Sequence, residues 1–162
     1  MMAISVGEKL PDVQLMIMTA DGPSAQSMAE FCKGKKTALF AVPGAFTPTC
    51  HMNHAPGYLA SHDELKAKGV DQIACVSVND VFVMDAWSKS LGADGKIVML
   101  ADGSGEFTEA LGLELDATGH GLGVRSHRYG MLVDDGVVTV LNIEGNPKEA
   151  DASSAETLLK SL

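Results

Sequence analysis

Short apolar runs, separated by glycine, proline and polar residues, recur along the chain. Thr37 to Val42 reads TALFAV and Ile73 to Val78 reads IACVSV; both are continuous apolar runs with the length of a strand covered on both faces. Near the end of the chain, Asp134-Asp135-Gly136 is a strong hairpin signal between two further runs. The pattern predicts strands over residues 13–18, 37–42, 73–78, 97–100, 129–133 and 137–143.

Between the strands the pattern becomes helical. The stretch 49–68 has a helical composition, but Pro56-Gly57 must kink or interrupt it, because proline lacks an N–H donor and clashes with the preceding turn. Asn79 or Asp80 is expected to cap a second helix. One side of that helix carries Val83, Met84 and Trp87.

The remaining segments complete one α/β domain over residues 1–162. A short helix over 106–111 and a glycine-rich loop over 119–123 precede the hairpin, and a capping box of Ser153 and Glu156 opens a last helix over 154–162. Two βα crossovers followed by a hairpin and a helix predict a central mixed β-sheet with helices on both faces. This is the arrangement of the thioredoxin-like fold.

The charge of the chain narrows its range of partners. Its 162 residues include 21 acidic and 12 basic ones, for a formal net charge of −9. Nucleic acid and anionic membrane surfaces attract clustered Lys and Arg, so neither is expected as a partner. The first residues lack the basic and apolar regions of a secretion signal, and no apolar run approaches the ~20 residues of a membrane span. We expect a soluble, cytoplasmic protein.

The three cysteines, Cys32, Cys50 and Cys75, form neither a C-x-x-C pair nor a secreted disulfide framework. Cys50 follows a loop that joins a buried strand to a helix, so it is expected in or near the first helical turn. Unpaired N–H groups and the helix dipole stabilise an anion there, which favours the thiolate, the nucleophilic form of cysteine. Pro43 and Pro48 stiffen this loop.

The same segment carries a family resemblance. The run Pro43-x-x-x-Thr47-x-x-Cys50 resembles the peroxiredoxin active-site signature. The longer segments VPGAFTPTC, His54-Ala-Pro-Gly57 and Cys75-Val-Ser-Val-Asn-Asp-Val-Phe-Val-Met84 are similar to the atypical, peroxiredoxin-5-like branch. The resemblance covers nearly the whole chain.

This resemblance implies a thiol-dependent peroxidase for hydrogen peroxide and alkyl hydroperoxides. Cys50 would be the peroxidatic cysteine, Thr47 and Pro43 would line the pocket, and Arg128 would stabilise the thiolate and bind the peroxide. The resulting sulfenic acid would be reduced by glutathione with glutaredoxin, or by thioredoxin. No bound cofactor is implied.

The identity of the second thiol is left open. In some members of the branch a cysteine at the position of Cys75 is the resolving thiol, although Cys75 also suits the core of an apolar strand. A disulfide with Cys50 would require Cα atoms within about 7 Å. The stretch 145–154, where other relatives carry a resolving cysteine, contains none, so an external thiol such as glutathione is favoured. Cys32 is interpreted as structural.

Arg125, His51 and His54 are further candidates near the predicted site. Arg125 would lie on the other side of a regular strand from Arg128 and reaches the site only if residues 123–126 bend. His51 and His54 could suggest a metal site with Cys50, but the set lacks a clear fourth ligand, so no metal is expected and His54 is interpreted as a packing or hydrogen-bonding residue.

Phe46, Phe82 and Trp87 are large apolar residues near the predicted site, and core packing explains them as well as an interface does. By resemblance, the neighbourhood of Phe46, Phe82 and Trp87 contributes to a homodimer interface that also walls the peroxide pocket. The alternatives to a peroxidase are a peroxide-sensing signalling module that acts through a partner protein, a disulfide oxidoreductase, which the missing C-x-x-C argues against, and a copper or zinc carrier.

Overall fold

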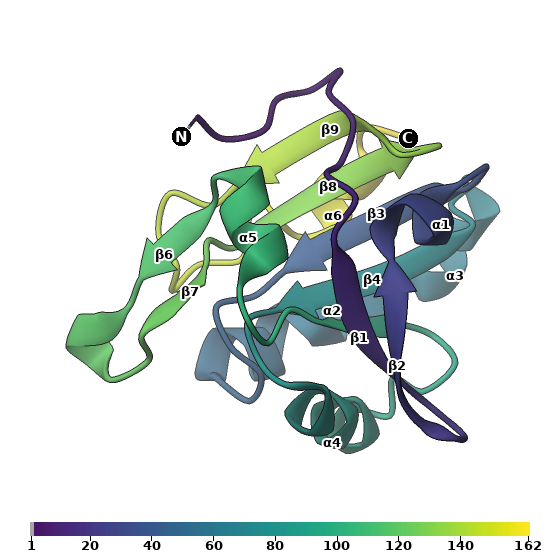
Figure 1. The fold of residues 1–162 in the computed structure, drawn as a ribbon. Coiled ribbons are helices and arrows are strands. Elements are labelled where there is room, and N and C mark those ends of the chain that lie inside the picture. The colour runs from purple at the N-terminus through teal and green to yellow at the C-terminus, as the bar shows by residue number, and fades with distance from the viewer. Residues whose placement is uncertain (1) are drawn as a thin grey trace.

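A computed structural model describes residues 2–162 (Figure 1). Its strands are β1 (Gln14–Thr19), β2 (Gly22–Ser27), β3 (Lys36–Ala41), β4 (Gln72–Ser77), β5 (Val98–Ala101), β6 (Glu114–Asp116), β7 (Val124–Ser126), β8 (Tyr129–Asp134) and β9 (Val137–Ile143). Its helices are α1 (Met28–Cys32), α2 (Ala55–Ala60), α3 (His62–Ala67), α4 (Val81–Leu91), α5 (Glu106–Leu111) and α6 (Ala155–Leu159), with a π-helical turn η1 (Cys50–His54) and a 3-10 turn η2 (Thr118–His120).

A mixed sheet forms the centre of the molecule. Its strands lie in the order β2-β1-β5-β4-β3-β8-β9, and β6 pairs with β7 in a separate two-stranded ribbon. The pairs β3–β4 and β4–β5 are parallel, whereas the strands outside them pair antiparallel. The predicted mixed sheet is confirmed, and its parallel centre brings the carboxyl ends of β3, β4 and β5 to one edge.

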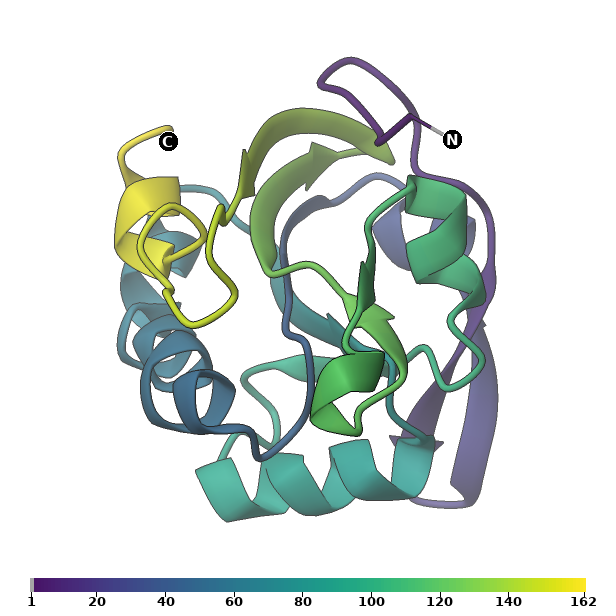
Figure 2. The same ribbon diagram turned by 90° about the vertical axis from the view of Figure 1, so that its left-hand side faces the viewer.

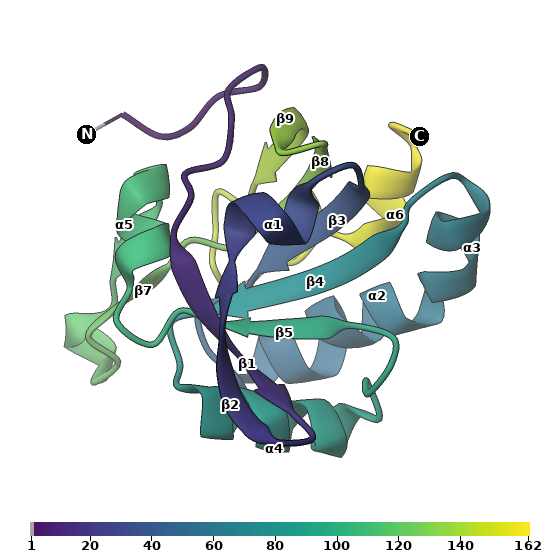
Figure 3. The same cartoon turned by 45° about the vertical axis from the view of Figure 1, so that its right-hand side comes forward.

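Helices cover both faces of this sheet, as predicted (Figure 2). Side chains of β3 alternate between two apolar clusters: Ala38 and Phe40 face the cluster that includes α2, α3, α4 and α6, while Leu39 and Ala41 face the cluster of α1 and α5. The run TALFAV is continuous in apolarity because both of its faces are buried. The helix α4 packs against β1 and β5 (Figure 3).

Three strands were not predicted. β2 pairs antiparallel with β1 across a tight turn, but its sequence GPSAQS has few β-forming residues because it is an edge strand with exposed positions. Similarly, β6 and β7 are three residues each and largely exposed, and they flank the predicted loop over 119–123. Tertiary contacts determine how β2, β6 and β7 pair, so the sequences of these strands carry little hydrophobic pattern.

The predicted long helix over 49–68 is divided differently from the expectation. Helical backbone begins at Pro48, a π-helical turn follows over Cys50–His54, and the chain breaks between α2 and α3 at Ser61. Pro56-Gly57, where an interruption was predicted, lies within α2, and Pro56 fits among the first residues of that helix. The observed irregularity comes one turn before it, where the Ala55 N–H donates to the Cys50 carbonyl. A π turn therefore absorbs the irregularity that a proline imposes.

The predicted capping box of the last helix is wrong. Ser154 is the N-cap of α6, and its hydroxyl accepts from the Thr157 N–H. Ser153 is buried instead, and both its N–H and its hydroxyl donate to the Glu144 carboxylate at 2.9 Å. The helix also ends at Leu159, not at Leu162. Ser153 therefore binds the buried Glu144 carboxylate and does not cap the helix. No local sequence pattern reveals this contact.

Candidate active site

Cys50 lies where the sequence predicted it, in the first turn of the helical segment that follows β3. It is the third residue of that segment, and its side chain is fully buried. The Thr47 carbonyl accepts from the His51 N–H at 2.9 Å, and this hydrogen bond stabilises the first turn. Backbone N–H groups at such a helix start lack intrahelical partners and stabilise an anion.

Thr47 contacts the sulfur directly. Its hydroxyl oxygen lies 2.7 Å from Cys50 Sγ and 2.8 Å from the Gly44 carbonyl oxygen. A hydroxyl has one proton, so Thr47 donates either to the carbonyl or to the sulfur. When it donates to Gly44, its lone pairs face the sulfur or a bound molecule beside it. The hydroxyl can therefore act as donor or acceptor within one small site.

Arg128 reaches the same sulfur from β8's N-terminal side. Its Nη2 lies 3.0 Å from Cys50 Sγ, and Nη2 and Nε donate to the Pro147 carbonyl at 3.2 and 3.3 Å. The side chain is 2% exposed. A buried guanidinium, which stays protonated, strongly favours an anion at the sulfur.

His54 completes the immediate surroundings of Arg128. Arg128 Nη1 donates to His54 Nδ1 at 2.9 Å, and His54 Nε2 donates to the Ser153 carbonyl at 3.0 Å. Tyr58 donates to the same carbonyl at 2.8 Å. Burial, and then the charge of Arg128, lower the pKa of His54 to about 3. The imidazole is therefore neutral at physiological pH.

The loop between β3 and Cys50 is held from two sides. The Ala45 N–H donates to Asn79 Oδ1 at 2.9 Å, and Arg125 Nη1 donates to the Pro43 carbonyl at 3.4 Å. Pro43 is buried, and Phe46 adopts a positive φ of 65°, which is unusual for a residue with a side chain. Contacts from the residues after β4 and from β7 thus maintain a strained turn beside the sulfur.

Comparison with known proteins identifies the family of this site. The family model described as Redoxin matches residues 5–159. Peroxiredoxin-2B of Arabidopsis thaliana is 49% identical over 163 residues, which cover 100% of both chains, and its chloroplastic relative peroxiredoxin-2E is 52% identical over 99% of this chain and 70% of its own. The crystal structure of reduced Prx3 in complex with H2O2 from Vibrio vulnificus has a TM-score of 0.93 at 53% identity, covering 98% of both chains.

The chain belongs to the peroxiredoxin family. Peroxiredoxin 5 from Alvinella pompejana also superimposes, with a TM-score of 0.85 at 39% identity over 98% of this chain and 97% of that chain. The thioredoxin-like fold expected from the order of elements is thereby confirmed. The chain is a thiol-dependent peroxidase.

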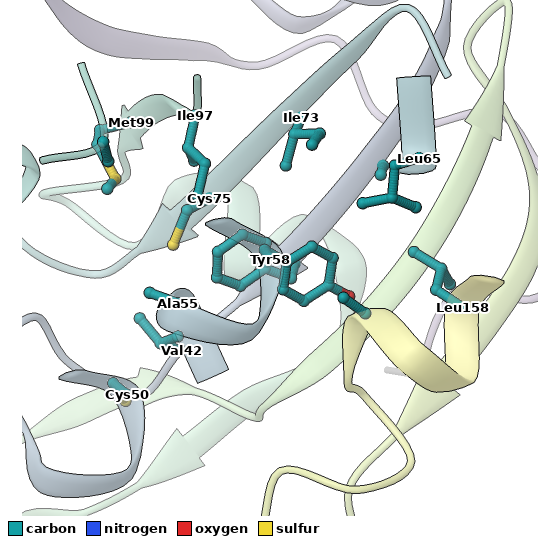
Figure 4. Packing of buried hydrophobic residues seen from close by; sticks show 14 of the residues in the cluster. Val42, Cys50, Ala55, Tyr58, Leu65, Ile73, Cys75, Ile97, Met99 and Leu158 are labelled. Atoms are coloured by element: carbon teal, nitrogen blue, oxygen red, sulfur yellow. The ribbon is translucent and has the colours of Figure 1, made fainter. Parts of the chain in front are cut away.

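The other two cysteines of this peroxiredoxin are buried free thiols. Cys75 lies on β4, and in the view of Figure 4 Val42 and Ala55 lie between it and Cys50. Burial, and then the proximity of Cys50, raise the pKa of Cys75 well above its usual value. Burial also raises the pKa of Cys32. Both thiols are protonated at physiological pH, and neither is accessible from solvent.

The histidines and large apolar residues have distinct partners. Trp87 is buried and its Nε1 donates to His51 Nδ1 at 3.0 Å, so His51 faces α4 while His54 faces Arg128. Within residues 2–162 no three His, Cys, Asp or Glu side chains are gathered as a metal-binding group. Phe46 and Phe82 are 49% and 65% exposed.

Two residues that organise the site, Asn79 and Ser153, were not predicted to do so. Asn79 holds the loop, and Ser153 fixes His54 through its carbonyl. A signal for Asn79 was available: β3 and β4 are adjacent parallel strands, so the residues that follow them meet at one edge. No such signal exists for Ser153, which lies in a loop far from Cys50 in sequence. Arg125, expected to contact the site only through a bend, does reach the loop at Pro43.

Proposed function

We propose that Cys50 is the peroxidatic cysteine of this peroxiredoxin and that Thr47, Arg128 and Pro43 form its pocket. The supporting observation is the convergence of the Thr47 hydroxyl and the Arg128 guanidinium on one sulfur, at 2.7 and 3.0 Å. Arg128 and Cys50 are 78 residues apart in the sequence. Such convergence supplies both a stabilised thiolate and donors for a developing charge.

The first half of the reaction follows from this geometry. The Cys50 thiolate attacks one peroxide oxygen; an S–O bond forms and the O–O bond breaks. The departing hydroxide or alkoxide takes up a proton and leaves as water or alcohol, and the cysteine becomes a sulfenic acid. Arg128 and Thr47 stabilise the negative charge as it moves from sulfur to the leaving oxygen. Hydrogen peroxide and alkyl hydroperoxides are the expected substrates.

The second half requires an external thiol. Cys75 and Cys32 are buried and protonated, which supports glutathione with glutaredoxin, or thioredoxin, over an internal resolving cysteine. One thiol condenses with the sulfenic acid, releasing water, and a second displaces the protein thiolate as a disulfide forms. Because Cys50 is fully buried, its helical turn must open before a thiol as large as glutathione reaches it. No bound cofactor is needed in this cycle.

The chain is also inferred to be a homodimer that acts in antioxidant defence in a reducing compartment such as the cytoplasm. Phe46, in the loop before Cys50, and Phe82, on α4, are large apolar side chains that are exposed, which supports an interface there. Free, buried cysteines suit a reducing compartment. Among residues 2–162, no helix has the length and apolarity needed to cross a membrane.

The deciding experiment is intact mass spectrometry under non-reducing conditions. Reduced wild type treated with one equivalent of hydrogen peroxide should gain one oxygen, glutathione should convert that species to an adduct, and Cys50→Ser should remain unchanged. Loss of two hydrogens would instead identify Cys75 or Cys32 as a resolving thiol. Unmodified Cys50 after peroxide treatment would refute the assignment, and slow turnover with every reductant would favour the sensor alternative.

A further inference from the structure

Arg128 is a buried cation with an unusual set of partners. Neither of the two ion pairs found within residues 2–162 involves it. Its hydrogen bonds go to the Cys50 sulfur, to the Pro147 carbonyl and to the ring of His54. Buried charges are ordinarily compensated by an opposite charge. In this site the nearest group that can supply one is the Cys50 sulfur, 3.0 Å from Arg128 Nη2, in its thiolate form.

The tautomer of His54 follows from its two neighbours. A guanidinium has only donors, so His54 Nδ1 must accept from Arg128 Nη1 at 2.9 Å. The Ser153 carbonyl oxygen can only accept a hydrogen bond, so His54 Nε2 must carry the proton and donate to it at 3.0 Å. The neutral Nε2–H form is thus specified on both sides. The ring is 2% exposed, and water has no place between these groups.

A neutral acceptor has an electrostatic consequence that a carboxylate would not have. Either group can orient the guanidinium by accepting from Nη1, but a carboxylate would also pair with its charge and weaken the field at the sulfur. We propose that His54 is a positioning residue of the peroxidase reaction: its neutral imidazole orients Arg128 toward Cys50 while leaving the guanidinium charge free to stabilise the thiolate. This proposal rests on the assignment of Cys50 as the peroxidatic residue.

The surroundings of His54 keep the imidazole neutral. Arg128, which immediately precedes β8, and Tyr58 of α2 face the ring directly. Asp151 and Glu156 line the same small pocket from the segment at α6. Burial and Arg128 outweigh the hydrogen bond to Ser153 and lower the pKa of His54 to about 3. Protonation at Nδ1 would break the bond to Arg128. Because the pKa of His54 is lowered to about 3, the ring stays neutral and the bond is kept at physiological pH.

An isosteric pair of variants tests the role of charge. His54→Asn places a neutral oxygen near the position of Nδ1, and His54→Asp places a carboxylate there; both lose the bond to Ser153 equally. The pH profile of Cys50 alkylation by iodoacetamide, read by peptide mass, is the measurement. Its midpoint in the Asp variant should lie about one pH unit or more above that of the Asn variant. At neutral pH, kcat/KM for hydrogen peroxide should fall in parallel.

A third variant tests orientation and does not depend on the folding of the Asp variant. His54→Leu removes the acceptor without adding charge, so kcat/KM should fall below that of His54→Asn while thermal unfolding shows both to be folded. Equal midpoints for Asn and Asp, or a Leu variant as active as Asn, would overturn the proposal. Because alkylation needs no peroxide, the result is independent of the Cys50 assignment, which fails separately if Cys50→Ser retains peroxidase activity.

Nitrogen NMR of the wild type supplies a spectroscopic test. The ring of His54 should show the neutral Nε2–H pattern and should not titrate between about pH 4 and pH 8, since its pKa is lowered to about 3. A His54 signal that titrates near the ordinary histidine pKa of about 6.5 would contradict the arrangement.

Discussion

At the scale of single residues, the site depends on side chains that each contact more than one partner. The Thr47 hydroxyl touches both the Gly44 carbonyl and the Cys50 sulfur, and the Arg128 guanidinium divides its donors among the sulfur, a carbonyl and an imidazole. A hydroxyl can exchange donor and acceptor roles, whereas a guanidinium cannot. Thr47 is therefore suited to a reaction in which charge moves between atoms.

Removing the hydroxyl of Thr47 tests this role. In Thr47→Val the side chain keeps its shape but loses donor and acceptor, so kcat/KM for hydrogen peroxide should fall roughly a hundredfold, as for the loss of one donor to a developing oxyanion. Thr47→Ser keeps the hydroxyl and should retain most of the activity. Stopped-flow kinetics measure both variants. Equal losses in Val and Ser would indicate a role for the methyl group instead.

At the scale of elements, the loop before α6 packs closely against β8. This packing positions the Ser153 carbonyl, which accepts from His54. A Cβ built on Gly130 would meet the Ser153 carbonyl oxygen at 2.6 Å and the Tyr58 hydroxyl at 2.8 Å. The Ser153 carbonyl accepts from both His54 and Tyr58, so a displaced loop would alter the contacts behind Arg128. Gly130 is thus required by contact with backbone and not by its own conformation.

Gly130→Ala should destabilise the protein by about 1–3 kcal/mol, because a backbone carbonyl cannot move aside as a flexible side chain can. It should also reduce peroxidase activity through His54. Gly57→Ala is the matched control: it lies in α2 with nothing within 4 Å of the added Cβ, so stability should rise by about 0.5–1 kcal/mol. Urea unfolding measures both. Two variants of equal stability would show that the loop adjusts freely.

At the scale of the whole molecule, the sheet gathers the site from three distant segments. The loop after β3 brings Cys50, the approach to β8 brings Arg128, and the segment between β9 and α6 brings the Pro147 and Ser153 carbonyls. The exposed Phe82 belongs to α4, and the ring of the exposed Phe46 lies 6.4 Å from that of Trp87 on the same helix. The helix α4 lies at the opposite end of the molecule from the N-terminal segment (Figures 1 and 3).

The proposed dimer gives a prediction at this scale. Phe82→Glu places a charge in the proposed interface and should shift the protein toward monomer in sedimentation velocity, because charge is depleted from the cores of interfaces. Val6→Glu, at a similarly exposed apolar position in the N-terminal segment, should not. A wild type that sediments as a monomer at micromolar concentration would contradict the dimer.

Much of this peroxiredoxin could be predicted from its sequence. The apolar runs of β3 and β4, the mixed sheet, and the place of Cys50 at a helix start all follow from local patterns, because burial and helix geometry are imposed on neighbouring residues. The motif around Cys50 predicted the family. In contrast, the polar edge strand β2 was missed, and the capping serine was misassigned, because both depend on partners elsewhere in the chain.

The sequence by itself determined the fold class and the chemical identity of the reactive groups: a thiol after a buried strand, a hydroxyl three residues before it, and an arginine near a later strand. Only the tertiary structure decided what surrounds them. The pairing of β3 with β8 brings Arg128 to Cys50, and the fold of the last loop supplies the carbonyl that orients His54. Directional contacts and the exclusion of water depend on distances between remote segments, and a linear pattern does not contain those distances.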